Sequence, residues 1–498
     1  MALIGLDVGT SGCKCIIFGD GGGVMARQYR EYPVVNPGPG LFELDPEGVW
    51  EAVKTVIGKA VRDYRGEKIT ALCLSSFGEA GVPVDRAGRV LDRSLLYTDG
   101  RGGAQCERLK NALGPTAIMH WTGLHAHPMY SINKLMWLRE NRPEIYRDTW
   151  KFMLFEDFIL FRLGGAAAID YSLASRTMAF NVTRKEWQAE IFEAAGVAED
   201  IFSTPVPGGT AIGAIKPEVA AELQLPRDLQ LVTGGHDQVC AAVGGGIIGE
   251  GLAINGMGTV ECITPAFAGP KLDQRMFEAN FACVPHPREG MFVTYAFNFT
   301  GGALLKWYRD SFASWEGTAA GAARNFYAAM DARAAAGPTR LLVLPHFAGA
   351  GTPFMDTQAK GAIIGLGLDS DASQIYRAML EGVTYEMLFN VEALETAGIG
   401  IRELRAVGGG AKSDLWLQIK ADIMGRKVTA LEVEEAGALG AAMLAGTATG
   451  LYPSLEKAAE TLVRIKKEFH PDPANHSFYR ENYRRYRKMY AAVREVML

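Results

Sequence analysis

The chain has 498 residues, more than one ordinary hydrophobic core holds, so we expect two domains. Hydrophobic residues make up 48% of it and charged residues 21%, as in a soluble globular protein, and no apolar run is long enough to span a bilayer. The net charge of −5, without a large basic block, argues against a nucleic-acid partner. The N-terminus lacks a signal-peptide pattern and the seven scattered cysteines lack metal-ligand spacing, so we expect reduced thiols and a cytoplasmic protein without a membrane partner.

The chain begins with a predicted β-hairpin whose tip is rich in hydroxyls and backbone amides. The sequence predicts strands at 2–7 and 13–18, joined by the turn GTSG at Gly9–Gly12. Successive N–H groups in such a turn form a concave anion site, although an ordinary hairpin turn accounts for the same residues. Asp7 ends the first strand and faces this tip.

Polar side chains at strand ends are candidates to bind a small polar ligand. Glu79 follows one predicted strand, and Asp99 and Arg101 end another. Taken singly, each of these is more often solvated surface. Asp157 lies inside the apolar run 152–161, where a buried acid needs a partner or a task.

The middle of the chain carries the strongest sign of catalysis. Residues 229–232 predict a buried strand and the small apolar residues from Gln238 onward predict a helix, with GGHD between them. Asp237 therefore stands at a strand-to-helix junction, where a carboxylate can accept a proton from a hydroxyl during phosphoryl transfer. Capping of the following helix explains this stretch equally well by itself. Upstream, the hydroxyl-rich segment 170–181 predicts a strand and a turn that line a cleft.

The second half begins at a glycine-dense stretch, 244–251, where we place the domain boundary. A strand, the turn GMGT at Gly256–Thr259 and a second strand then repeat the pattern of the N-terminal hairpin, which suggests two related halves that each supply a phosphate loop. The pair Gly301–Gly302 precedes a predicted helix, which is another place for a phosphate. Near the end, GGGAKSD at 408–414 follows a predicted strand and precedes a helix.

Six separated motifs give the chain a resemblance to a known family. MYSINKLMWLREN from Met129 and GAIIGLGLDSDASQIYRAMLE at Gly361–Glu381 resemble the two signatures of the FGGY family of carbohydrate kinases. GLDVGTSGCK, GGHDQ, GMGT and GGGAKSDLWLQIKAD add four further matches in the expected order. The resemblance implies an α/β fold of two ribonuclease H-like domains, as in actin and hexokinase, with a cleft between them. The N-terminal domain, 1–243, would hold the sugar and the base, and the C-terminal domain, 244–498, would bind the nucleotide.

The same resemblance implies two cofactors, ATP and Mg²⁺, and roles for individual residues. Asp237 is the expected general base, and Asp7 and Asp237 are the expected Mg²⁺ ligands, Asp7 through water. The expected nucleotide contacts are Gly9, Thr10 and Ser11 of the first turn, Gly258 and Thr259 of the second, Gly301 and Gly302 along the phosphates, and Gly409, Gly410, Ala411 and Ser413 around the adenosine. We expect Gly409 and Gly410 to lie against the adenosine, which leaves no room for a Cβ, and Asp237 to have an unperturbed pKa near ~3.9.

In the segment that contacts the substrate in this family, the sequence differs from two well-known branches. Xylulokinases carry Gln-Met-His-Gly where this chain has FGEA at 77–80, and the Arg-Glu pair of glycerol kinases is also missing. The nucleotide loop resembles that of xylulokinases, whereas SSFGEAG and GGHD resemble fuculokinase-type branches. We therefore expect Glu79 to accept a hydrogen bond from a sugar hydroxyl, in a pocket completed by Asp99, Arg101, Asp157, Asp237 and Gln238.

Such a pocket, with four carboxylates and one guanidinium, favours a neutral substrate with several hydroxyls, namely a ketopentose or related ketose, with a polyol as the alternative. A pairing of Arg101 with Asp99 that only holds the strand end is equally consistent with the sequence. An active ATP-dependent sugar kinase is favoured over a non-catalytic sugar- or nucleotide-binding relative, and over an actin-like assembly protein, because Asp7, Asp237 and both phosphate turns are retained. The oligomeric state stays open, with a homodimer among the options.

Overall fold

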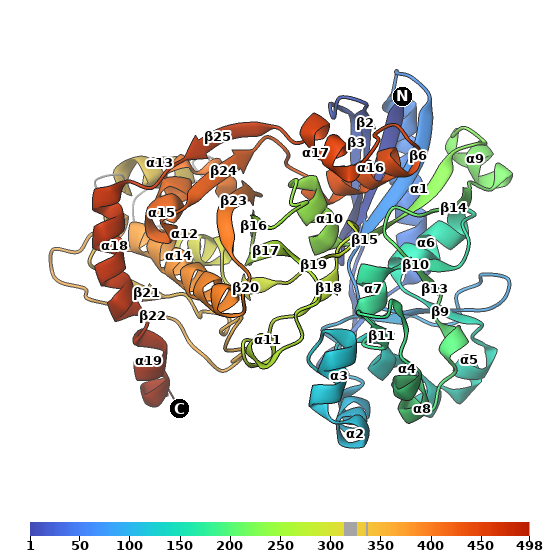
Figure 1. The fold of residues 1–498 in the computed structure, drawn as a ribbon, viewed down its shortest axis with the longest axis horizontal. Coiled ribbons are helices and arrows are strands. Elements are labelled where there is room, and N and C mark those ends of the chain that lie inside the picture. Colours follow the sequence, from blue (N-terminus) through green and yellow to red (C-terminus); the bar gives the residue numbers. More distant parts are fainter. Residues whose placement is uncertain (313–325, 335–336, 498) are drawn as a thin grey trace.

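The chain folds into two α/β lobes that lie side by side (Figure 1). The computed structural model describes residues 1–312, 326–334 and 337–497. Each lobe is built around one large mixed sheet, which confirms the predicted two-domain α/β fold.

The N-terminal lobe has a six-stranded sheet that brings three strand ends to one edge. Its strands lie in the order β14, β15, β6, β1, β2 and β3, which span Ala211–Ala214, Gln230–His236, Ile69–Ser76, Ala2–Val8, Gly12–Gly19 and Val24–Glu31. β1, β6 and β15 run parallel, whereas β2, β3 and β14 are antiparallel to their neighbours. In this register Asp7 lies beside Ser75, and His236 lies beside Ser76. The carboxyl ends of the parallel strands therefore gather polar side chains at a single edge.

The C-terminal lobe repeats this plan. Its path runs β18, β19, β17, β16, β23, β24 and β25, with β20 also paired to β17; these strands span Val284–Pro285, Met291–Val293, Glu261–Ala268, Gly251–Met257, Ile401–Val407, Lys427–Leu431, Ile465–Phe469 and, for β20, Ala296–Asn298. β16 and β17 form an antiparallel hairpin like β1 and β2, and β16, β23 and β24 run parallel. This topology confirms that the two halves are related.

The remaining elements surround the two sheets. The N-terminal helices are α1 Pro46–Asp63, α2 Gly103–Leu113, α3 Pro115–Thr122, α4 Ser131–Asn141, α5 Pro143–Asp148, α6 Phe155–Leu163, α7 Tyr171–Ser175, α8 Ala189–Ala195, α9 Pro217–Leu223 and α10 Asp237–Gly244. The C-terminal helices are α11 Gln274–Glu278, α12 Gly302–Phe312, α13 Phe326–Arg333, α14 Ala372–Thr396, α15 Asp414–Met424, α16 Ala436–Ala448, α17 Leu455–Leu462, α18 Pro473–Tyr486 and α19 Met489–Met497. The short strands are β4 Val35–Gly38, β5 Leu41–Leu44, β7 Val82–Val84, β8 Ser94–Leu95, β9 Lys151–Met153, β10 Ala168–Asp170, β11 Phe180–Asn181, β12 Glu186–Trp187, β13 Thr204–Val206, β21 Leu342–Leu344 and β22 Ala362–Ile364. Within the described ranges, no helix has the length and apolarity that a membrane crossing requires.

The segment 170–181 contains a short helix that the sequence prediction missed. The carboxylate of Asp170 accepts the backbone N–H groups of Ser172 and Leu173, at 2.6 and 3.0 Å, and so caps α7. Aspartate is a favourable N-cap because it satisfies amides that the first helical turn leaves unpaired. A strand does follow, but only at β11.

Two helices, α10 and α16, connect the lobes. α16 belongs to the C-terminal half of the sequence, yet it packs on β1, β6 and β15 of the N-terminal sheet and on α10 (Figure 1). A Cβ on Gly244 would lie 1.9 Å from the carbonyl oxygen of Ala436, and a Cβ on Gly440 would lie 1.9 Å from that of Cys240. The two backbones therefore approach closely only because glycine occupies both positions.

We expect Gly440→Ala to destabilise the protein, by about 1–3 kcal/mol or more, because its methyl group must displace backbone atoms. Gly58→Ala in α1 is the matched control, since there the new Cβ meets Leu223 Cδ2 only at 3.8 Å and Arg62 Nη1 at 3.4 Å. The control should be neutral or gain about 0.5–1 kcal/mol from helix propensity. Urea unfolding of both variants measures this, and equal stability of the two would contradict the close crossing.

Candidate active site

Asp237, the expected general base, begins α10 directly after β15. Although 38% of its side chain is exposed, the surrounding protein removes enough solvation, with added repulsion from Asp7, to raise the pKa of Asp237 to about 7. The backbone N–H of Gln238 donates to this carboxylate, and Nε2 of His236 lies 3.3 Å from Oδ1. Burial lowers the pKa of His236 well below its ordinary value, so the imidazole is neutral. The expectation of an ordinary pKa for Asp237 is wrong, because burial outweighs the helix N-terminus.

Asp7 lies at the same sheet edge, at the end of β1. Ser75 Oγ donates to its Oδ1 at 2.8 Å, and burial raises the pKa of Asp7. Lys14 lies opposite Asp7 in the hairpin, and its Nζ pairs with Glu435 Oε2 at 2.7 Å. The ammonium group is therefore held near both Asp7 and Glu435. Among the described residues no cluster of three or more His, Cys, Asp or Glu side chains could enclose a metal. Two carboxylates close enough to repel each other fit Mg²⁺, which binds oxygen ligands and keeps several waters when bound to proteins.

The predicted phosphate turns in the C-terminal lobe form one unit. Gly302 N–H donates to the carbonyl of Gly258 at 2.8 Å, and Gly301 N–H donates to that of Thr259 at 2.9 Å. A Cβ on Gly302 would lie 2.9 Å from Gly258 O, and one on Gly301 would lie 3.0 Å from Val260 C. The diglycine therefore braces the exposed GMGT turn, and its own amides are already used for this contact.

The N-terminal turn leaves its hydroxyls accessible. Gly9 N–H donates to Gly12 O at 2.9 Å and closes the turn, while Ser11 is exposed and Thr10 half-buried. The hydroxyl of Tyr97 contacts the Thr10 side chain. Tyr97 is thus a neighbour of the phosphate turn that the sequence analysis did not select.

The nucleotide loop follows β23 and packs on the GMGT strand. Gly410 begins a 3₁₀ turn that includes Ala411, and a Cβ on Gly410 would lie 2.9 Å from both Met257 and Trp416. A Cβ on Gly409 would meet no protein atom within 4 Å, so the space beside Gly409 is open and its expected contact with the adenosine stays a prediction. Ser413 Oγ accepts the N–H of Trp416 at 3.0 Å and caps α15. Gly410 therefore serves internal packing, whereas Gly409 faces open space.

Asp99 and Arg101 pair with each other, as in the alternative interpretation. Arg101 Nη2 lies 2.7 Å from Asp99 Oδ2 and 2.7 Å from Glu43 Oε1. The backbone N–H of Phe42 also donates to Asp99 at 2.7 Å, and the Arg101 guanidinium stacks over Trp137. These contacts hold a loop, and the expected contact of Asp99 and Arg101 with a sugar stays a prediction.

Asp157 is fully buried away from these groups and does not join the site. Its Oδ2 accepts the hydroxyl of Ser203 at 2.5 Å, and burial raises its pKa to about 7. Its neighbour Glu156 instead supports the catalytic turn, because Glu156 Oε1 accepts Gly234 N–H at 2.6 Å. Consecutive residues of a helix point about 100° apart, so only one of the two acids can face β15. The expected sugar contact of Asp157 is therefore corrected.

Glu79 is buried beside an arginine that the sequence analysis missed. Its side chain pairs with Arg176, which emerges from the turn after α7 and is itself 7% exposed. Burial raises the pKa of Glu79, while Arg176 acts to lower it. The Arg176 guanidinium lies over the rings of Tyr130 and Tyr295, at 5.1 and 5.9 Å from their centroids. The surroundings of Asp237 are therefore less acidic than expected.

The C-terminal lobe contributes directly to these surroundings through Tyr295. This residue lies between β19 and β20, and its hydroxyl is 3.2 Å from Nδ1 of His236. Because His236 also touches Asp237, the contact connects the second lobe to the base. No sequence motif predicts that Tyr295 or Arg176 belongs to the site, since Tyr295 is a single aromatic residue and Arg176 is a single cation in a polar segment.

The chain thus has two α/β lobes of related topology, with Asp237 at the end of β15 and a glycine-rich turn in each lobe. Models of the N-terminal and C-terminal domains of the FGGY family of carbohydrate kinases match residues 2–244 and 254–449. The chain therefore belongs to the FGGY family and is a carbohydrate kinase that phosphorylates a sugar hydroxyl.

Relatives with different substrates are similar to the chain along nearly its whole length. A xylulose kinase of Bacillus subtilis is 29% identical, with 99% of this chain and 97% of that protein covered. A gluconokinase of the same organism is 27% identical, with 92% and 90% covered. The structure of a xylulose kinase from Rhodospirillum rubrum superposes with a TM-score of 0.90 at 26% identity and covers 100% of both chains.

We expect the kcat/KM of the enzyme to fall as the pH drops through about 7, because a general base must be ionised and the pKa of free Asp237 is about 7. Rates measured from pH 5 to 9, with both substrates below KM and MgATP held constant, test this. Asp157→Asn is the control, since that carboxyl also has a pKa of about 7 but lies elsewhere. A profile that stays flat down to pH 5 would show that Asp237 keeps an ordinary pKa.

We expect Gly409→Val to raise the KM for ATP by roughly tenfold or more with little loss of stability, because the side chain enters open space that the adenosine would fill. Gly410→Val should instead destabilise the protein by about 1–3 kcal/mol, because it meets Met257 and Trp416. Kinetics and thermal melts of both variants separate the two effects. An unchanged KM for ATP in Gly409→Val would place the adenosine elsewhere.

Proposed function

We propose that this chain transfers the terminal phosphoryl group of ATP to a hydroxyl of a small neutral sugar, a ketopentose or related ketose. The observation that carries the proposal is the position of Asp237, with Asp7 at the same sheet edge and an exposed turn in each lobe, at Ser11 and at Gly258 and Thr259, to contact phosphates. The xylulose kinases among the relatives support a ketose, and a glycerol kinase of Plasmodium falciparum that shares the fold was solved with ADP. The proposed domains are 1–243 for sugar and base and 244–498 for nucleotide.

In the proposed reaction, the sugar hydroxyl oxygen forms a bond to the terminal phosphorus of ATP. The bond between that phosphorus and the oxygen of the leaving diphosphate breaks, and ADP departs with that electron pair. Asp237 accepts the hydroxyl proton, which its pKa of about 7 makes feasible near neutral pH. Asp7 and Asp237 would hold Mg²⁺, which supplies charge neutralisation on the phosphates when bound. The remaining catalysis is positioning by the turns.

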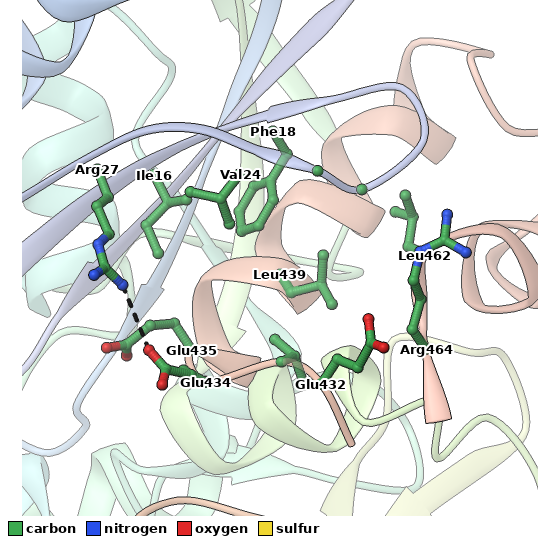
Figure 2. Close-up of a pocket in the computed structure, with 13 residues that line it drawn as sticks. Ile16, Phe18, Val24, Arg27, Glu432, Glu434, Glu435, Leu439, Leu462 and Arg464 are labelled. Carbon is green, nitrogen blue, oxygen red and sulfur yellow. Dashed lines mark hydrogen bonds and ion pairs between the residues drawn. The ribbon is translucent and has the colours of Figure 1, made fainter. Parts of the chain in front are cut away.

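Both lobes must contact one ATP in this proposal, so the lobes are proposed to close around it, with the hinge at 244–251. A cavity of about 280 Å³ lies where the N-terminal hairpin meets α16 and the segments beside it (Figure 2). Phe18 of the N-terminal hairpin and Leu439 of α16 line it, and Arg27 Nη1 reaches across to Glu434 Oε2 at 3.4 Å. That exposed ion pair is weak and can adjust during closure.

The charge of the sugar pocket favours a neutral substrate. Glu79 and Arg176 offset each other, while Asp7 and Asp237 leave an excess of negative charge near the reacting hydroxyl. A sugar acid is the second candidate, because Arg176 supplies one guanidinium and a gluconokinase is among the relatives. A kinase screen across ketoses, aldoses, polyols and aldonic acids decides between them.

We expect Asp237→Asn to lower kcat by about 10²- to 10⁴-fold, since the change removes the proton acceptor and little else. Calorimetric titrations should show that ATP and the preferred sugar still bind, which excludes misfolding as the cause. A variant that keeps more than about a tenth of the rate would remove Asp237 from the mechanism. A wild-type chain that binds sugar but phosphorylates none in the screen would instead support the non-catalytic alternative.

A further inference from the structure

Gly78 and Arg176 fit each other in a way that no other residue at position 78 would allow. A Cβ on Gly78 would lie 2.8 Å from Cγ and 3.1 Å from Cβ of Arg176, and 3.2 Å from Cδ2 of His236. A side chain at position 78 would therefore push the stem of Arg176 out of its place. The absence of a side chain at Gly78 admits an arginine from a distant segment into the sugar pocket.

Arg176 is fixed in this place from several sides. Its Nε and Nη2 both contact Oε1 of Glu79, and its guanidinium lies over Tyr130 and Tyr295. Glu79 has a φ of 68°, which is rare outside glycine and is held in part by the hydrogen bond from Ser131 Oγ to its carbonyl at 2.7 Å. A strained backbone that the surroundings hold in place is typical of a residue with a functional task.

The fixed pair keeps both a donor and an acceptor for a ligand. A guanidinium has five N–H donors, more than its contacts to Glu79 and to the Tyr130 hydroxyl use. In the described part of the chain, no hydrogen bond reaches Oε2 of Glu79, so its lone pairs can accept from a hydroxyl. Both groups lie near enough to Asp237 for their charges to act on its pKa, which Glu79 raises and Arg176 lowers.

We propose that Arg176, admitted by Gly78 and held by Glu79, is a specificity-determining residue that binds two neighbouring oxygens of the sugar. The inference rests on the proposed function and deepens it. One sugar hydroxyl donates to Glu79 Oε2, and the neighbouring hydroxyl or carbonyl oxygen accepts from Arg176. The pair selects a neutral vicinal diol or hydroxyketone beside the phosphorylated hydroxyl. A carboxylate at this place would gain Arg176 but be repelled by Glu79.

The test uses the full-length enzyme with three variants: Gly78→Ala, Arg176→Lys and the double variant. Each single change should lower kcat/KM for the preferred sugar by about 10- to 100-fold, which is the effect of losing a hydrogen bond to a charged group, while the KM for ATP changes less than about twofold. The double variant should lose less than the product of the two single losses, because most of the effect of Gly78→Ala passes through the position of Arg176. Gly103→Ala is the matched control, since a Cβ there meets nothing within 4 Å, and it should behave as wild type.

A second measurement compares kcat/KM for the preferred sugar with that for a deoxy analogue that lacks one hydroxyl next to the reacting one. A purely structural role of Arg176 would leave the ratio of these two values unchanged. The wild-type enzyme should prefer the parent sugar by about 10-fold or more, and Arg176→Lys should lose most of that preference. Undiminished preference in Arg176→Lys, or additive losses in the double variant, would overturn the assignment. If Gly78→Ala fails to fold, the preference of Arg176→Lys still decides the outcome. A wild-type enzyme inactive on every sugar would instead refute the proposed function, and the role of Arg176 with it.

Discussion

The close crossing of α10 and α16 is the contact on which the rest of this structure depends. The two helix backbones meet at Gly244 and Gly440, where any side chain would collide with a carbonyl. Because α10 begins with Asp237 and α16 begins beside Asp7, this crossing also sets the distance between the two acids. The same contact joins the lobes, so one helix crossing both positions the two acids and attaches the C-terminal lobe to the N-terminal sheet.

The catalytic edge concentrates negative charge, and the protein offsets only part of it. Asp7 and Asp237 both have raised pKa values because burial removes water from their carboxylates. Lys14 forms an ion pair with Glu435, and Arg176 forms one with Glu79, so both cations pair with an acid other than Asp237. In the proposed function, a magnesium ion and the proton of a sugar hydroxyl would offset the remaining negative charge. Under this proposal, the repulsion between the two carboxylates falls when the reactants bind.

Sequence patterns predicted the framework of this protein well. The hairpin–turn repeats, the strand before Asp237 and the glycine turns depend on local periodicity and on backbone freedom at glycine, and the structure has them where they were expected. The side chains of the sugar pocket were predicted less well. Asp99 and Arg101 satisfy each other, and Asp157 points to Ser203, because pairing partners come from segments that a linear pattern does not relate.

The sequence by itself determined the two-domain α/β architecture, the family and the identity of the candidate base, since each is carried by short continuous stretches. Only the tertiary structure decided which charged groups surround that base. Arg176 reaches Glu79 across 97 positions of sequence, through a space left by Gly78, and Tyr295 arrives from the other lobe. Only the folded chain shows the pKa of Asp237, because a carboxyl's affinity for its proton depends on the water and charges around it, and folding alone assembles that environment.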